Sequence, residues 1–400
     1  MKESFNQAEE LLNKIISLTS VEKFQGSSKE SIEHFKKCHS EIRKKFPGFK
    51  VVTIAGTNGK GHVAYALEDL LTKNQIKCSK WCSPHLYTIC ERISFAGKPI
   101  AVNDLNEIVK KIEPLHKELN FSFYEFLFAC FCEFVLGLEE LEVLILEVGL
   151  GGRLDTTNNF DADISCLVSV GLDHTEYLGE TLKEILLEKV EISRKNRPHI
   201  STVGIDYLKK IENDFVSKRG GHYQNIHDPE LTYFHQNQNM VKQVFHLLYP
   251  EIKITENDVG SLSLGPGRMQ EQKLGQHTLV LNGSHNPDGF KALTDYFYRE
   301  SKKFDFILLG FANRTEKEIN QILKIIEKYP CRFSEIKITS FQHPRALPHS
   351  EASRIAEINQ IPFVNYSEFL DTIKMQNNAL KVLLTGSNYF LSEVFKQLHI

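Results

Sequence analysis

The stretch VVTIAGTNGKGHVAYALEDLL, residues 51–71, places a strand, a glycine-rich loop and a helix in direct succession. Residues 51–55 are apolar or β-branched, which predicts a buried strand. Apolar side chains then recur at helical spacing over residues 63–71. The glycines in between, within residues 56–61, let backbone N–H groups approach a phosphate at the N-terminus of the helix. This stretch therefore predicts an α/β fold organised around a phosphate-binding loop.

Lys60 closes a shortened form of the phosphate-loop motif, GxxGK, from which its ammonium can reach the β- and γ-phosphates of a nucleotide. The full spacing requires a glycine where this chain has Ile54. His62 stands where such loops carry the Ser or Thr hydroxyl that binds Mg²⁺. An ordinary strand-to-helix turn is the alternative interpretation. The residues predicted to bind nucleotide here are Gly56, Thr57, Asn58, Gly59, Lys60 and Gly61.

Short β-branched runs alternate with helical stretches along the rest of the chain, which predicts parallel sheets covered by helices. We therefore predict a P-loop-containing parallel-sheet ATPase domain over residues 1–272 and a smaller Rossmann-like α/β domain over residues 273–400. Residues 260–272 contain a Gly-Pro-Gly turn and are expected to form a linker, whereas residues 206–230 carry little periodicity. The expected strands after the first are 141–148, 164–170 and 199–203, then 278–281, 304–309, 336–339 and 382–385.

The composition excludes several classes of protein. The 400 residues include 48 basic and 51 acidic side chains, a net charge of -3, so no large positive field draws the chain to nucleic acid or to a membrane surface. The eight cysteines form no CxxC pair and indicate free thiols in a reducing compartment. The N-terminus has no apolar signal segment, and the longest apolar run, residues 126–136, is too short to span a bilayer. We expect a cytoplasmic monomer.

Glu147 ends an otherwise apolar strand and is followed by three glycines within residues 149–152. A carboxylate in such a place is costly unless it is paired or binds a metal ion. The glycines permit close approach of another backbone or a ligand. The alternative to metal binding is an ion pair with Arg153.

Lys189 continues the helical stripe of Leu182, Ile185 and Leu186, so we expect it to face the protein or a cleft rather than bulk water. The alternative is a surface lysine balanced by Glu188, with only its aliphatic stem covered.

His174 and Ser83 are weaker candidates on the residues alone. His174 follows Asp173, and the pair could belong to an ordinary helix-capping segment. Ser83 precedes Pro84 after an expected strand, and a plain turn accounts for that dipeptide. The Ser83 hydroxyl would nevertheless supply the oxygen ligand that His62 cannot.

A series of motifs in order along the chain resembles folylpolyglutamate synthase/dihydrofolate synthase, the folate branch of the Mur ligase superfamily. A weaker TGS phrase at 385–387 agrees with it. The other motifs are AGTNGKG at 55–61, SPHL at 83–86, ERI at 91–93, EVGLGGRLD at 147–155, LDHT at 172–175, EK at 188–189, PGR at 266–268 and HNP at 285–287.

This resemblance implies the Mur ligase architecture and an ATP-dependent amide ligase. Such an enzyme joins L-glutamate to dihydropteroate, to the glutamate tail of reduced folates, or to both, through an acyl phosphate, with two Mg²⁺ ions. The alternatives are a Mur-type ligase of another carboxylate and a nucleotide-binding homologue without ligase activity. The last alternative is motivated by His62 and by Asn282, which stands where the family has an acidic residue.

The resemblance also implies roles for individual residues. Asn239 would contact adenine, and Asn282 and His285 would contact the nucleotide from the second domain, which would also bind glutamate. Lys60 and Arg268 would hold phosphate. The implied metal ligands are Ser83, Glu147, His174 and a carbamylated Lys189, and the implied catalytic residues are Lys60, Glu147, His174, Lys189 and Arg268.

Overall fold

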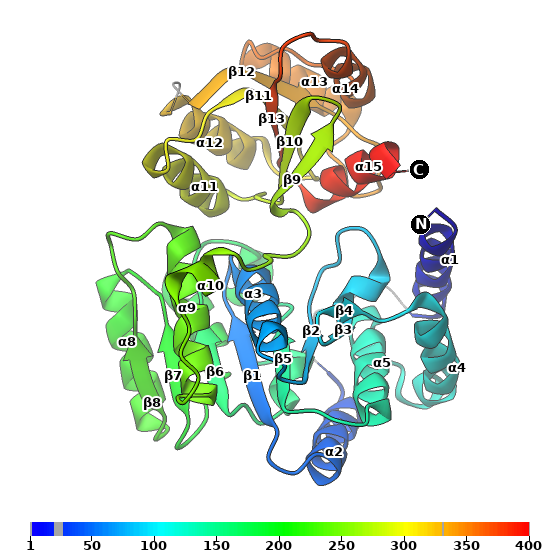
Figure 1. Ribbon diagram of the computed structural model, residues 1–400, viewed down its shortest axis with the longest axis vertical. Helices are drawn as coiled ribbons and strands as arrows, with labels where there is room; N and C mark the ends of the chain where they lie inside the picture. The colour runs from blue at the N-terminus through cyan, green and yellow to red at the C-terminus, as the bar shows by residue number, and fades with distance from the viewer. Residues whose placement is uncertain (1, 20–26, 330–331, 400) are drawn as a thin grey trace. The chain divides into compact units, whose positions relative to one another are not determined.

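The computed structural model describes residues 2–19, 27–329 and 332–399. The chain forms two compact units (Figure 1). The first comprises residues up to 231 together with 235–263, and the second comprises residues 232–234 and 264–400. Both units are α/β, as predicted.

The first unit is built on an eight-stranded sheet with the order β4-β3-β2-β5-β1-β6-β7-β8. In this order, each strand from β2 to β8 pairs in parallel with its neighbour, whereas β3 pairs antiparallel with both β2 and β4. The strand bounds are β1 (Lys50–Ala55), β2 (Cys78–Trp81), β3 (Ile93–Phe95), β4 (Lys98–Pro99), β5 (Val143–Glu147), β6 (Ile164–Leu167), β7 (Pro198–Ser201) and β8 (His222–Asn225).

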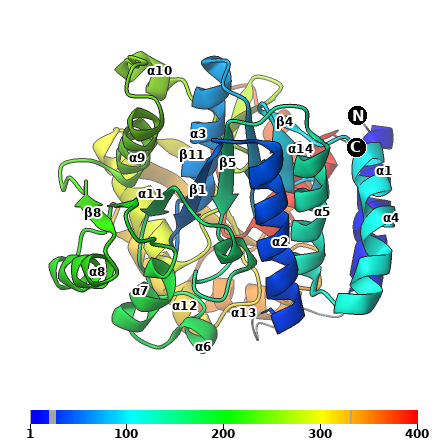
Figure 2. The same cartoon turned by 90° about the horizontal axis from the view of Figure 1, so that it is seen from below.

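Helices cover both faces of this sheet (Figure 2). One face packs against α5: the core there contains Trp81, Leu144 and Leu146 together with the aromatic side chains of that helix. Helix α3 packs on β1, β2 and β5. A reciprocal capping box between Ser122 and Glu125 starts α5. The helices are α1 (Lys2–Leu18), α2 (Lys29–Lys45), α3 (Lys60–Lys73), α4 (Val102–Leu119), α5 (Phe123–Gly137), α6 (Thr175–Leu178), α7 (Leu182–Val190), α8 (Asp206–Lys218), α9 (Tyr233–Leu248) and α10 (Glu256–Gly260), with 3-10 turns η1 (Ile89–Arg92) and η2 (Thr156–Asn159).

The segment with little periodicity, residues 206–230, contains α8 and the edge strand β8. The buried stripe of α8 is Leu208, Glu212 and Val216, so a carboxylate occupies its central position. Glu212 is fully buried and accepts hydrogen bonds from Ser201 Oγ at 2.8 Å and Tyr223 OH at 3.2 Å. A polar network in place of an apolar stripe removes the sequence signal of this helix.

The second unit has a five-stranded sheet with the order β12-β11-β13-β10-β9, in which only the β9–β10 pair is antiparallel. Its elements are β9 (Arg268–Leu274), β10 (His277–Asn282), β11 (Phe304–Gly310), β12 (Phe333–Thr339), β13 (Lys381–Thr385), α11 (Pro287–Arg299), α12 (Glu316–Glu327), α13 (His349–Ile358), α14 (Tyr366–Lys374) and α15 (Asn388–His399).

The expected linker, residues 260–272, is partly wrong because β9 begins at Arg268 and pairs with β10. Gly275, at φ +60°, turns the chain between the two strands. β9 is an edge strand whose side chains are mostly polar and only partly buried. Pairing through the backbone alone leaves no period-2 apolar pattern to detect. The expected functional roles of domains 1–272 and 273–400 stay predictions.

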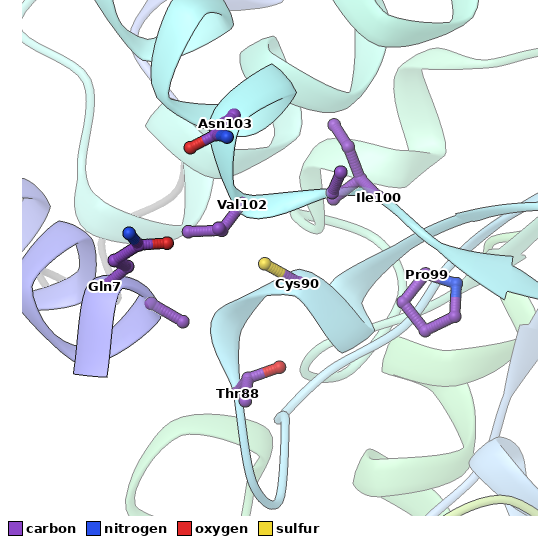
Figure 3. Close-up of a pocket in the computed structure, with 9 residues that line it drawn as sticks. Gln7, Thr88, Cys90, Pro99, Ile100, Val102 and Asn103 are labelled. Atoms are coloured by element: carbon purple, nitrogen blue, oxygen red, sulfur yellow. The ribbon is translucent and has the colours of Figure 1, made fainter. Parts of the chain in front are cut away.

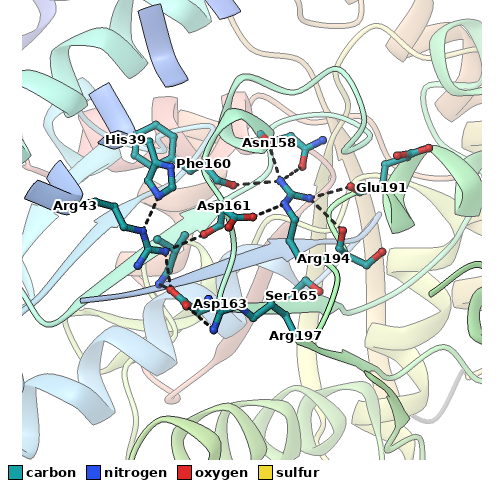
Figure 4. A network of polar contacts seen from close by, with 12 residues as sticks. His39, Arg43, Asn158, Phe160, Asp161, Asp163, Ser165, Glu191, Arg194 and Arg197 are labelled. Carbon is teal, nitrogen blue, oxygen red and sulfur yellow. Dashed lines mark hydrogen bonds and ion pairs between the residues drawn. The ribbon is translucent and has the colours of Figure 1, made fainter. Parts of the chain in front are cut away.

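A network of charged side chains holds the amino end of β6 (Figure 4). Asp163 accepts hydrogen bonds from Arg43 Nη2 at 2.9 Å, from the backbone N–H of Val51 at 2.9 Å, and pairs with Arg197 Nη1 at 3.1 Å. Asp163 is 5% exposed, so these partners offset its desolvation. The network ties α2, β1 and β7 together at the edge opposite the carboxyl ends of the strands.

The described cysteines, seven in number, are buried free thiols, as expected, and Cys331 lies outside the described residues. Within the described ranges, every helix is too short or too polar to cross a bilayer.

Candidate active site

The glycine-rich loop, Ser83, Glu147 and His174 lie at the ends of four neighbouring strands of the first unit, whereas Lys189 lies on α7 and Asn239 on α9. In the sheet order, β2, β5, β1 and β6 lie side by side. Ser83 follows β2, Glu147 ends β5 in register with Ile54 of β1, and His174 follows β6. Because parallel strands end at the same edge, the fold brings these residues and the glycine-rich loop after β1 to one edge of the sheet.

The glycine-rich loop joins β1 to α3 as predicted. Gly59 is the residue before the helix and has φ +88°, and a Cβ there would lie 2.9 Å from Val168 Cγ1. Both conditions require glycine. Lys60 folds back over the loop, and its Nζ donates to the carbonyl oxygens of Gly56 at 2.9 Å and Thr57 at 3.3 Å. The Lys60 ammonium therefore lies over the loop, which is the position that the phosphate motif predicts for it.

Residues after β6 brace the loop. Ser169 Oγ accepts from the backbone N–H of Asn58 and donates to its carbonyl, both at 2.8 Å. Thr57 donates its backbone N–H to Ser169 O at 3.0 Å, and its hydroxyl accepts from Gly171 N at 3.0 Å. These contacts preorganise the loop, and Ser169 carries no motif that would have identified it from sequence.

His62 is buried, with 4% of its surface exposed. Its Nδ1 lies 3.2 Å from the Asn237 side-chain amide on α9, and the same amide lies 3.0 Å from where a Cβ of Gly59 would be. Asn239, the predicted adenine contact, lies on the same helix and is half-buried. Sequence reasoning missed Asn237, which contacts the start of α3.

We expect His62→Ser to lower the free energy of unfolding by about 1–3 kcal/mol, because the shorter side chain leaves a space and the Asn237 amide loses its ring nitrogen. Turnover per folded molecule should be retained. Urea titration and steady-state ATP dependence measure the two effects. Unchanged stability with a large rise in the KM for ATP would instead show that the imidazole contacts nucleotide.

Glu147 is 3% exposed, and its Oε2 accepts a hydrogen bond from the backbone N–H of Ser83 at 3.2 Å. The alternative pairing of Glu147 with Arg153 is not the one found. Arg153 Nε instead pairs with Glu188 Oε1 at 3.0 Å. Glu188 is the carboxylate that was expected to balance a surface Lys189, and it is paired with Arg153 instead.

Lys189 is buried at the end of α7, with 3% of its surface exposed. Burial and the positive charge of Lys60 lower its pKa to about 7, against the opposing effects of Asp173 and Asp155. Close packing fixes this helix, because a Cβ on Gly152 would lie 2.8 Å from Lys189 O. A buried lysine amine that is half neutral near pH 7 is chemically suited to carbamylation.

His174 takes a left-handed conformation, φ 51°, at the start of α6, and its side chain is exposed. Its backbone N–H lies 3.2 Å from Asp173 Oδ1. His174 is therefore an exposed residue at the end of the loop that follows β6.

Asp155, the last residue of the EVGLGGRLD motif, has a role that the sequence reasoning did not assign. It accepts hydrogen bonds from the backbone N–H groups of Gly149 at 2.9 Å and Leu150 at 3.1 Å, and from Thr157 Oγ1 at 2.6 Å. Burial raises its pKa, while these hydrogen bonds lower it. Asp155 thus holds the glycine-rich turn that follows Glu147, and Tyr124 OH donates to it at 3.3 Å.

The SPHL and ERI motifs meet in the structure. Glu91 accepts from the backbone N–H groups of Leu86, Tyr87 and Thr88 at 2.9, 2.7 and 2.7 Å. Arg92 Nε donates to His85 Nδ1 at 2.9 Å. Burial and Arg92 lower the pKa of His85 to about 3, so the ring is neutral and can accept. The two motifs therefore fix the loop that carries Ser83.

The predicted residues of the second unit lie at the carboxyl end of β10 and the start of β9. Asn282 Oδ1 accepts from Ser284 N at 3.0 Å, and His285 Nδ1 lies 2.8 Å from Gly283 O. Arg268 Nη1 donates to Pro266 O at 3.0 Å. Asn282 is buried and His285 is half-buried.

A cavity of about 470 Å³ lies elsewhere in the first unit (Figure 3). None of the predicted site residues lines it. Its walls come from α1, η1, β4 and the start of α4, and include Gln7, Thr88, Cys90, Ile100 and Asn103.

In the part of the chain that the structure describes, no three His, Cys, Asp or Glu side chains converge as a metal site. The donor chemistry nevertheless fits Mg²⁺, since Glu147 offers a buried carboxylate and adjoining Ser83 a hydroxyl, both oxygen donors. A carbamylated Lys189 would add a third oxygen donor.

Comparisons with known proteins agree with the motifs. No family model matches the chain. It is 26% identical over 396 residues to dihydrofolate synthase/folylpolyglutamate synthase of Bacillus subtilis, covering 86% of this chain and 89% of that protein. Its fold matches bifunctional folylpolyglutamate synthase/dihydrofolate synthase from Yersinia pestis complexed with AMPPNP and Mn ion, with a TM-score of 0.80, 23% identity and 98% of both chains covered. A structure of the bifunctional enzyme with Mn, AMPPNP and L-glutamate bound gives 0.79, 23% and 98% of both chains. The resemblance that the motifs indicate is confirmed.

Proposed function

We propose that this chain, a relative of the folylpolyglutamate synthase/dihydrofolate synthases, is an ATP-dependent ligase of an acid and an amino acid. It joins L-glutamate to dihydropteroate, to the glutamate tail of reduced folates, or to both, through an acyl phosphate. One observation carries the proposal: the phosphate-type loop, Ser83, Glu147 and Lys189 lie on one unit of a chain that is similar to the synthase over 86% of its length.

The chain's own groups act mainly by charge and position. Backbone N–H groups of residues 59–61 and the Lys60 ammonium bind the phosphates, while the N–H groups of Thr57 and Asn58 are donated to Ser169, which keeps that loop in place. Bound Mg²⁺ would neutralise the part of the phosphate charge that the protein's own cations do not neutralise. Lys60 and Glu147 thus need no change of protonation state for the chemistry.

The remaining roles follow the resemblance. We assign phosphate contact to Arg268 and nucleotide contact to Asn239, Asn282 and His285. We assign metal ligation to Ser83, Glu147, His174 and the carbamylated Lys189. The protein is proposed to be a cytoplasmic monomer that acts on small molecules.

ADP release that requires both L-glutamate and an acceptor tests the proposed function. The assay is run with dihydropteroate and with tetrahydrofolate, which separates the two acceptor activities. Release with either acceptor supports a folate ligase. ATP binding without acceptor-dependent ADP release would favour the nucleotide-binding homologue, and release with neither pterin but with another carboxylate would favour another Mur-type ligase.

We expect Lys189→Ala to lose at least about 10²-fold in turnover, because the carbamate oxygens disappear with the amine. Carbamylation joins the neutral amine to CO₂ and releases a proton, so the pKa of about 7 leaves the reactive form available at neutral pH and scarce well below it. Partial rescue of Lys189→Ala by short carboxylic acids checks the role. Lys183→Ala, earlier on the same helix, is the control and should be unaffected. Electron density for a bare ammonium at Lys189, in crystals grown near neutral pH with metal bound, would contradict the carbamate.

A further inference from the structure

A buried ion pair joins helix α3 to strand β2 in the first unit. Lys80 Nζ contacts Glu68 Oε2, and the two side chains are 1% and 4% exposed. Lys80 projects from the face of the sheet opposite to its neighbour Trp81, which lies in the aromatic core with α5. Taking two charges out of water is costly, and apolar side chains of similar volume usually give the same stability or more. Packing alone therefore does not explain a charged pair at this place.

Two further contacts hold the pair in one arrangement. Ser94 Oγ, on β3, donates a hydrogen bond to Glu68 Oε1, so the carboxylate reaches two strands from α3. The Lys80 ammonium lies over the ring of Tyr65, 3.4 Å from its centroid, and Tyr65 lies one turn before Glu68 on α3. In any other register of α3 on β2, both charges would lose these partners inside the protein. The pair thus specifies one position of α3 against β2, which non-directional apolar contacts would not do.

The two elements that the pair joins both lead to the candidate site. Helix α3 begins directly after the glycine-rich loop, and Glu68 lies about two turns along it. Ser83 follows β2 and lies three residues after Lys80. Cys82 Sγ lies 3.4 Å from Tyr65 OH, so the tyrosine under the Lys80 ammonium also contacts the residue before Ser83. A shift of β2 along α3 would therefore move Ser83 relative to the phosphate loop.

We infer that Lys80 and Glu68 are positioning residues, which hold the Ser83 hydroxyl at a fixed distance from the phosphate loop and so shape the site for a divalent cation bound with a nucleotide. This inference rests on the part of the proposed function that makes Ser83 a metal ligand. Both side chains act through the elements that they join, because they are buried between α3 and the sheet.

The double variant Glu68→Gln/Lys80→Met tests the inference. It removes both charges together, while the new amide can still accept from Ser94 Oγ and the new thioether can still lie over Tyr65. We expect the urea midpoint to be unchanged or higher, because no charge is left buried alone. The dissociation constant of Mn²⁺ from the protein–ADP complex, measured by EPR, should rise roughly 10-fold or more, as for other residues that support a metal ligand. The affinity for ADP without metal, measured by calorimetry, should stay the same.

Arg43→Met/Asp163→Asn is the matched control. That pair also joins a helix to the sheet, and Asp163 is 5% exposed, but it lies at the amino end of β6, away from the candidate site. The control should bind Mn²⁺ as tightly as the unaltered chain. Glu68→Asp carries the same test should the double variant fail to fold, because it keeps the charge and shortens the link between α3 and β2. Its Mn²⁺ affinity should fall as well.

Unchanged Mn²⁺ affinity in the folded double variant, or in Glu68→Asp where the double variant does not fold, overturns the inference alone, because the pair would then serve only the fold. An equal loss of Mn²⁺ affinity in Arg43→Met/Asp163→Asn overturns it too, since the effect would not be specific to α3 and β2. If the unaltered chain binds Mn²⁺ with ADP but releases no ADP with either acceptor, the ligase proposal fails and the positioning inference stands. Absence of Mn²⁺ binding to the ADP complex of the unaltered chain overturns the metal-ligand assignment and the inference with it.

Discussion

Lys60→Ala should lower acceptor-dependent ADP release by roughly 10²- to 10³-fold, the loss typical of removing one preorganised charge from a reacting group. The Lys60 ammonium lies over the loop between β1 and α3, donating to two carbonyl oxygens of that loop. Without it, the positive charge over this loop is gone, while the backbone N–H groups at the start of α3 remain. Turnover at saturating ATP and the ATP dependence together measure the effect.

The fold should survive this change, because Lys60 is only half-buried and its hydrogen bonds run to a loop that Ser169 also holds. We expect the melting temperature to fall by a few degrees at most, about the effect of 1 kcal/mol in a protein of this size. Lys73→Ala, at the other end of α3, is the matched control and should keep full activity. Near-normal turnover of Lys60→Ala would remove the phosphate-loop assignment.

The sequence is most informative where one physical requirement repeats along the chain. The strand and helix around residues 51–71 are found as predicted because apolar periodicity marks both of them. The edge at which Ser83 and Glu147 meet was also predictable, since residues after parallel strands share an edge.

Other features carry no local signal because partners distant in sequence create them. Asn237 reaches His62 from 175 positions away, and Ser169 braces Asn58 from 111 positions away. A neutral amide or hydroxyl has no preferred spacing that would reveal such a contact. Asp155 differs, because it is the last residue of a quoted motif. It lies only five positions from Leu150 and six from Gly149, so the sequence was open to the interpretation that it braces this turn.

Buried charged residues are difficult to interpret from the sequence pattern for a different reason. Glu212 sits in the apolar stripe of α8, and Lys189 continues the stripe of α7. The Glu212 carboxylate is held by two hydroxyl groups and by His199, whereas burial and the charge of Lys60 lower the pKa of Lys189 to about 7. Only the surrounding partners distinguish the two cases, and those partners come from the fold.

Glu147→Gln should remove most magnesium-dependent activity, by roughly 10²-fold or more at low millimolar Mg²⁺, because a neutral amide is a far weaker ligand for a hard dication than a carboxylate. The exchange keeps the shape of the side chain and an oxygen that can accept from Ser83 N. Stability should therefore change little, since replacing a buried carboxylate with an amide also removes the cost of burying its charge. A Mg²⁺ titration of ADP release separates the weakened ligation from a general loss of fold.

Glu142→Gln provides the control at the opposite end of the same strand. Glu142 precedes β5 and accepts the backbone N–H of Lys77 at 2.8 Å, so its amide variant keeps that bond as well. The two variants make the same chemical change and differ in which edge of the sheet they alter. Glu142→Gln should titrate with Mg²⁺ like the unaltered chain, and Glu147→Gln should need much more Mg²⁺ and reach a lower maximum. Coincident titration curves for both variants would show that Glu147 is an ordinary buried carboxylate.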